Sequence, residues 1–252
     1  MNTIVYTIEE QFRAVMELPL AAENEARLRA ALQELMYNLL ADPQRKHDFK
    51  LQSMLLACKM RMRALQNLIA CGKSETTFWR CDIRSMAEDI CSAADLLLSP
   101  LDRAVHFEAP EEYIEAACSP RDFSWLVLEL ICNAARHTHG EDITVRMQPK
   151  RPLKHRKPNA CVLTAESAGS IDLGQLHASC SREGSGVSAM LRTAQLHNST
   201  LLWLGRDGQS VAAWRFPLQK PSGLLEWEAP DLVELLSDQC SQVYVALAQV
   251  CG

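Results

Sequence analysis

The chain has 252 residues, of which 48% are hydrophobic and 23% charged, and its formal net charge at pH 7 is -5. This balance is typical of a folded globular protein with a sizeable core, and it gives no argument for binding nucleic acid or an anionic membrane. No apolar run approaches the length of a membrane span, and the N-terminus lacks a basic start and a cleavable apolar region. We therefore expect a cytoplasmic protein.

The ten cysteines predict reduced thiols rather than disulfides or a zinc site. No two of them have C-x-x-C spacing, and Cys58, Cys91 and Cys132 fall on apolar helical faces. A cysteine in that setting behaves as a small hydrophobic residue.

Following a weakly informative segment, 1–22, the leucine pattern predicts a helical hairpin over residues 23–78. Apolar residues recur every three or four positions along the first helix, namely Leu28, Leu32, Leu35 and Leu39. A second apolar stripe covers 51–69, and Asp42-Pro43 separates the two helices. Such seams often pair with a second copy as a four-helix bundle, so we expect a homodimer through residues 23–72. The alternative is a monomeric hairpin that docks on the rest of the chain.

The apolar pattern predicts alternating helices and strands over residues 79–220, and it predicts a C-terminal helical extension over residues 221–252. A polar connector at 74–80 leads into this region. The expected helices cover 83–98, 120–138, 187–197 and 231–250, and the expected strands cover 104–108, 113–118, 143–147, 160–165, 201–204 and 211–216. Residues 166–188 are rich in Gly and Ser and predict a long loop, which in compact domains is usually a lid or a binding loop.

The most informative stretch is WLVLELICNAARHTH, in which two polar residues interrupt an apolar helix. Glu129 and Asn133 are four positions apart, so both project from one face of the helix. Buried without partners they would cost several kcal/mol. Either they contact a neighbouring loop, or they form a nucleotide site in which Asn133 supplies an oxygen to Mg²⁺ and Glu129 orients a water.

The segment LELICNAARHT resembles the asparagine box of the sensor histidine kinases and of the wider superfamily that includes gyrase, Hsp90 and MutL. The resemblance implies an α+β protein: a helical hairpin followed by an α/β sandwich of the histidine-kinase ATPase type. It implies that Asn133 coordinates Mg²⁺ on the triphosphate, that Arg136 lies near phosphate and that His137 flanks the nucleotide. Glu129 would be the general base.

Two further passages resemble the glycine motifs of the same superfamily. In VLTAESAGSI, Glu166 replaces the aspartate that accepts the adenine amino group, and Gly169 lies between Ala168 and Ser170, which replace two glycines. In GSGVS, Gly184 and Gly186 match the end of the lid, where main-chain N–H groups cradle phosphate.

The phosphoacceptor of the family is a His followed by an acidic residue on the first hairpin helix. The first helix here has no histidine, and His47-Asp48 has the matching chemistry at the start of the second helix. The alternative is that His47 is an exposed residue near a helix N-terminus.

Together these features predict a signalling protein that binds ATP and Mg²⁺ weakly and acts in a phosphorelay or in response-regulator control. Two alternatives remain open: a dimeric adaptor or pseudokinase of the same fold without catalysis, and an anti-sigma type serine kinase.

Overall fold

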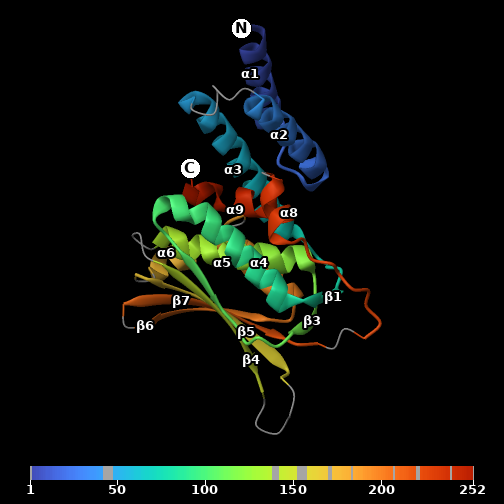
Figure 1. Ribbon diagram of the computed structural model, residues 1–252, viewed down its shortest axis with the longest axis vertical. Helices are drawn as coiled ribbons and strands as arrows, with labels where there is room; N and C mark the ends of the chain where they lie inside the picture. Colours follow the sequence, from blue (N-terminus) through green and yellow to red (C-terminus); the bar gives the residue numbers. More distant parts are fainter. Residues whose placement is uncertain are drawn as a thin grey trace.

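The computed structural model describes residues 2–41, 48–137, 142–151, 158–169, 172–182, 184–206, 208–219, 222–238 and 240–251. Within these ranges the chain forms a protruding helical unit and a helix-covered sheet (Figure 1). Short 3₁₀ turns lie at Ala22–Asn24 and Ser99–Leu101.

The helical unit consists of α1 (Asn2–Glu17), α2 (Glu25–Leu40) and α3 (Phe49–Gly72). The hairpin of α2 and α3 matches the sequence prediction. Asp48 caps α3, because its carboxylate accepts hydrogen bonds from the backbone N–H groups of Lys50 and Leu51. Helix α1 packs on both hairpin helices and adds a third helix to the unit.

The leucine seam of α2 is buried within the single chain. Each of its four leucines is at most 7% exposed: Leu28, Leu32, Leu35 and Leu39. Ile8 and Val15 of α1 belong to the same apolar cluster as these leucines and the inner face of α3. A homodimer through residues 23–72 would therefore have to use another face of the hairpin or displace α1.

The main sheet has the strand order β2-β4-β5-β7-β6. Its strands are β2 (Val105–Glu108), β4 (Ile143–Lys150), β5 (Ala160–Ala168), β6 (Thr200–Arg206) and β7 (Gln209–Pro217). β2 pairs with β4 in parallel, and the other neighbours are antiparallel. Buried and more exposed residues alternate along β4, β5 and β7, as in a sheet with one covered face.

A second, two-stranded sheet pairs β1 (Trp79–Asp82) with β3 (Glu115–Cys118), and Trp79 lies opposite Cys118. The sequence predicts a polar connector at 74–80, and β1 begins within it. Its four residues are too few to show a period of two, so its conformation depends on pairing with a strand that lies far along the chain.

Helices α4 (Ile83–Leu98), α5 (Pro120–His137) and α7 (Gly186–Leu196) form a layer over one face of the main sheet. Phe123 of α5 packs on Trp214 of β7, with 5.5 Å between the ring centroids, and both side chains are at most 1% exposed. This contact fixes the depth at which α5 lies on the sheet.

A further helix, α6 (Leu173–Ser181), lies within the segment that the composition predicts to be loop. Its cap is Asp172, whose carboxylate accepts hydrogen bonds from the N–H groups of Gly174 and Gln175. The high Gly and Ser content hid a helix of nine residues.

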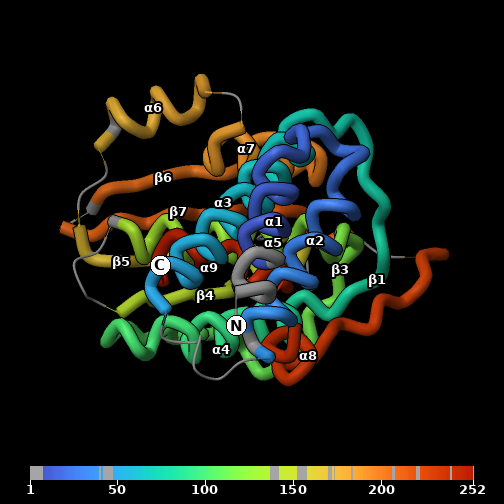
Figure 2. Tube along the Cα trace, turned by 90° about the horizontal axis from the view of Figure 1, so that it is seen from above, coloured from blue at the N-terminus to red at the C-terminus, as the bar shows by residue number. Residues whose placement is uncertain are grey.

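The C-terminal region forms two helices, α8 (Leu232–Ser237) and α9 (Gln242–Cys251), where the sequence predicts one over 231–250. The chain turns at Asp238, whose carboxylate accepts the N–H of Cys240. Helix α9 packs on α5, α4 and α3, and Figure 2 shows it lying beneath α3 when the molecule is seen from above. None of the helices that the structure describes is both long and apolar enough to cross a membrane.

Candidate functional site

The carboxylate of Glu129 forms a buried ion pair with Arg63 of α3. Oε1 and Oε2 lie 2.6 and 2.7 Å from Arg63 Nη2, and Oε2 accepts the well-directed hydrogen bond. The Glu129 side chain is 0% exposed and that of Arg63 is 2% exposed. The partner that the sequence required for Glu129 is therefore an arginine of the helical hairpin.

Arg63 also joins the C-terminal helix to this pair. Its Nη1 donates a hydrogen bond to the carbonyl oxygen of Ala246 in α9. Burial alone would lower the pKa of Arg63, but Glu129 and the nearby Cys132 raise it above its usual value. The guanidinium stays charged and holds α3, α5 and α9 together.

The lid glycines are explained by contacts within the chain. A Cβ on Gly186 would lie 2.7 Å from Glu129 Oε2, so only glycine lets the start of α7 lie against the buried carboxylate. Gly184 has φ of +75°, which L side chains rarely adopt, and a Cβ there would lie 2.9 Å from Leu68 of α3. Both glycines therefore serve the packing of α7.

Beside this ion pair lies a cavity of about 270 Å³ between the sheet, α5, α6 and the start of α7. That volume is slightly below the roughly 300–1,000 Å³ usual for small-molecule sites. Asn133, Arg136 and Gly186, which the resemblance assigns to nucleotide contacts, line the cavity, whereas Glu129 does not. The amide nitrogen of Asn133 lies 3.8 Å from Met190 Sδ.

On β5 the cavity is lined by the residue next to the predicted one. Ala165 and Ser167 face inward and are buried, while Glu166 points to the other face of the sheet. There the carboxylate of Glu166 accepts a hydrogen bond from Arg146. Glu166 thus lies outside the cavity, contrary to our expectation.

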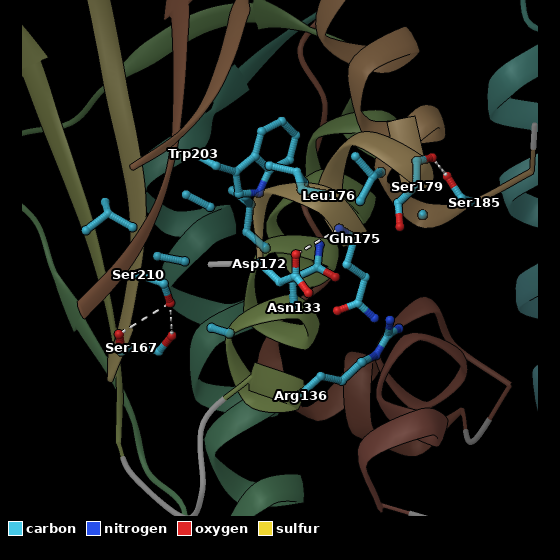
Figure 3. Close-up of a pocket in the computed structure, with 17 residues that line it drawn as sticks. Asn133, Arg136, Ser167, Asp172, Gln175, Leu176, Ser179, Ser185, Trp203 and Ser210 are labelled. Carbon is cyan, nitrogen blue, oxygen red and sulfur yellow. Dashed lines mark hydrogen bonds between the residues drawn. The ribbon is translucent and has the colours of Figure 1, made fainter. Parts of the chain in front are cut away.

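Ser167 shares a hydrogen bond with Ser210 of β7, with 3.0 Å between the two hydroxyl oxygens (Figure 3). These two neutral hydroxyls line the cavity at the end of β5, near where the resemblance placed a carboxylate. Gly169, with φ of 123°, follows the strand, and its N–H donates to the carbonyl of Gly208 rather than facing the cavity.

Sequence reasoning missed several lining residues. Trp203 of β6 and the α6 residues Gln175 and Leu176 lie around the cavity in Figure 3, together with the cap residue Asp172. The signal for α6 was present, because Asp172 precedes an apolar pair at helical spacing. Trp203 could not be placed without knowing which face of β6 is covered.

The structure does not describe the side chains of two predicted site residues, His47 and His137. His47 lies outside the described residues, and so does the side chain of His137, although His137 ends α5. All ten cysteines lie within the described ranges, and each is a free thiol.

The start of α5 is held by the buried side chain of His197. The N–H of Ser119 donates to His197 Nε2 at 3.3 Å, and His197 Nδ1 donates to the carbonyl of Thr193 at 3.0 Å. This arrangement requires neutral imidazole, and burial lowers the pKa of His197. Next to it, Asp122 accepts hydrogen bonds from Lys73 and Thr76, which ties α5 to the end of α3.

The sequence matches no family model and no curated protein, but the structure is similar to solved histidine kinases. The histidine kinase AdeS of Acinetobacter baumannii superposes with a TM-score of 0.54 at 14% identity, over 78% of this chain and 98% of that one. Full-length ShkA, solved with AMPPNP, gives a TM-score of 0.59 at 10% identity over 86% of this chain and 47% of ShkA. The catalytic domain of the histidine kinase ThkA gives 0.50 at 12% identity, over 57% of this chain and 97% of that domain. The chain therefore has the histidine-kinase ATPase fold, preceded by a helical region.

Proposed function

We propose that this chain is a signalling protein of the histidine-kinase fold that acts through protein contacts in a phosphorelay or in response-regulator control. Its nucleotide site does not support phosphoryl transfer. The observation that carries this proposal is the buried ion pair of Arg63 and Glu129.

A general base must reach the group that it deprotonates, directly or through one water. Glu129 is fully buried, its two oxygens face Arg63, and it does not line the cavity. Mg²⁺·ATP bound in this cavity would therefore lack Glu129 as a general base, and the residues present do not fit phosphoryl transfer from it.

The rest of the cavity supports weak binding of an anionic ligand. Arg136 and the N-terminus of α7 border it, and both favour negative charge. Asn133 offers a side-chain oxygen of the kind that Mg²⁺ accepts. In the family, a carboxylate accepts a hydrogen bond from the amino group of adenine. This cavity has the neutral hydroxyls of Ser167 and Ser210 instead, so no negative charge favours an amino group there.

Incubation of the full chain with γ-labelled ATP and Mg²⁺ tests the absence of transfer. We expect no stable label on the protein. Label that is lost in acid, kept in base and absent from His47→Ala would show that the chain is an active histidine kinase and would overturn the proposal.

Nucleotide binding is measured separately by thermal shift with ATP and Mg²⁺. We expect a shift of at most a few degrees that disappears in Asn133→Ala and is kept in Glu129→Gln when each variant is compared with its own unliganded form. A large shift that requires Glu129 would mean that the carboxylate leaves Arg63 to meet the nucleotide.

Partners of this function are a response regulator or a similar signalling protein, and a second copy of the chain. Since the α2 seam is covered by α1, dimerisation should survive substitutions in that seam that leave the fold intact. Sedimentation of Leu32→Met, a change that conserves volume, against the unmodified chain checks this expectation.

A further inference from the structure

A groove away from the nucleotide cavity lies between the N-terminal half of α3, the end of α4 and α9. Its volume is about 490 Å³, and its walls are mostly apolar. Side chains from all three helices line it, among them Phe49, Leu56, Lys59, Leu97, Tyr244 and Leu247.

Apolar surface at this groove extends to its rim. Phe49, which lines the groove at the start of α3, is 85% exposed. Large exposed apolar side chains around a concave surface mark interaction sites more often than isolated ones do.

Among the described residues that line this apolar groove, Lys59 is the one cation. Its ammonium group is 5.1 Å from the centroid of the Tyr244 ring, and no carboxylate among the described residues forms an ion pair with it. Burial lowers the pKa of Lys59, because desolvation of the ammonium outweighs the opposing influence of Cys240 and Cys251. A carboxylate brought into the groove would supply a counter-charge that none of the described residues provides.

The walls of the groove also select the backbone form of its occupant. They are helices, whose backbone groups are already hydrogen-bonded along their length, so they offer no strand edge to an extended peptide. A bound segment must therefore satisfy its own backbone groups, as a helix does.

We propose that this groove docks an amphipathic helix of a partner protein, one that carries an Asp or Glu among its apolar contact residues. The apolar residues pack on Phe49, Leu56 and Leu247, and the carboxylate pairs with Lys59. This proposal does not depend on the state of the nucleotide cavity, so a negative ATP experiment leaves it standing.

The probe is a displayed library of helical peptides, randomised along one face and selected on the full chain. We expect enriched peptides to carry aliphatic residues at helical spacing together with an acidic residue. Selection on Lys59→Glu should favour Lys or Arg at the acidic position instead, which tests the charge pairing directly.

Affinity of the best peptide is then measured for two groove variants and one matched control. Phe49→Ala and Lys59→Gln should each weaken binding about tenfold, the effect of losing a contact worth about 1.4 kcal/mol. The control is Leu202→Ala, which removes an exposed apolar side chain on β6, outside the groove. Leu202 is 51% exposed, and this change should leave affinity unchanged. Thermal unfolding of each variant confirms that the fold is intact.

Three outcomes would overturn the proposal. The first is a selection that enriches no peptide, and the second is a set of enriched peptides without an acidic residue or indifferent to Phe49→Ala. The third is a dimer in sedimentation that Phe49→Ala dissociates, because the occupant would then be a second copy of the chain.

Discussion

Replacing Arg63 by Met should destabilise the protein strongly, because it leaves a carboxylate without a partner in the interior. Glu129 is 0% exposed, and its only ion pair among the described residues is with Arg63. Met keeps most of the volume and apolar stem of Arg, so the substitution removes the charge and its hydrogen bonds rather than the packing.

The magnitude follows from the burial of both partners. Removing one partner of a buried ion pair costs about 3–5 kcal/mol, because the remaining charge loses its compensation. For a chain of this size, 1 kcal/mol lowers Tm by about 2–4 °C, so the expected drop is roughly 6–20 °C. The lost hydrogen bond to Ala246 of α9 places the result in the upper half of that range.

Urea unfolding followed by circular dichroism and tryptophan fluorescence measures the free energy of unfolding, and coincidence of the two curves tests two-state behaviour. Glu129→Gln and the double variant complete a thermodynamic cycle. The double variant should be more stable than the sum of the two single losses predicts, by about 1–3 kcal/mol. Two results would refute the view that the ion pair holds the hairpin and the sandwich together. One is additive losses of unfolding free energy in the two single variants, and the other is a loss below about 1 kcal/mol for Arg63→Met.

Two further predictions concern α7 and the start of α5. Gly186→Ala should cost about 1–3 kcal/mol, because its Cβ would meet the Glu129 carboxylate, whereas Gly72→Ala, with no atom within 4 Å, should cost nothing measurable by the same unfolding assay. The buried His197 has a lowered pKa, so the unfolded chain takes up that proton at a higher pH than the native chain. Stability should therefore rise with pH from the native pKa up to about 7, and fall as acid brings the pH below about 6.5. His197→Gln should flatten that part of the pH profile, and His177→Gln, a change at an exposed histidine, should not; an unchanged slope in His197→Gln would contradict the assignment.

The parts of the fold that could be predicted from the sequence are those with long, regular periodicity. The hairpin helices, α4, α5 and the longer strands follow from apolar spacing. The four-residue strand β1 was missed because its conformation depends on a remote partner strand. The α6 helix was missed because its composition is that of a loop.

At the candidate site, spacing along one helix was a sound guide and pairing between elements was not. Glu129 and Asn133 lie four residues apart on α5, but Asn133 lines the cavity whereas Glu129 pairs with Arg63, which lies far earlier in the chain and on another element. On β5 an error of one residue reversed the face, so Glu166 was expected where Ser167 lies. Because successive side chains of a strand point to opposite faces, a shift of one residue places every side chain on the wrong face of the sheet.

The position of α9 has a consequence for the order in which the protein matures. Val243 belongs to the core of the sandwich, and Val245 belongs to the core of the helical unit. During synthesis α9 emerges after both of these units, and domains generally begin to fold as they emerge. Each unit therefore keeps part of its apolar surface uncovered until α9 packs against it.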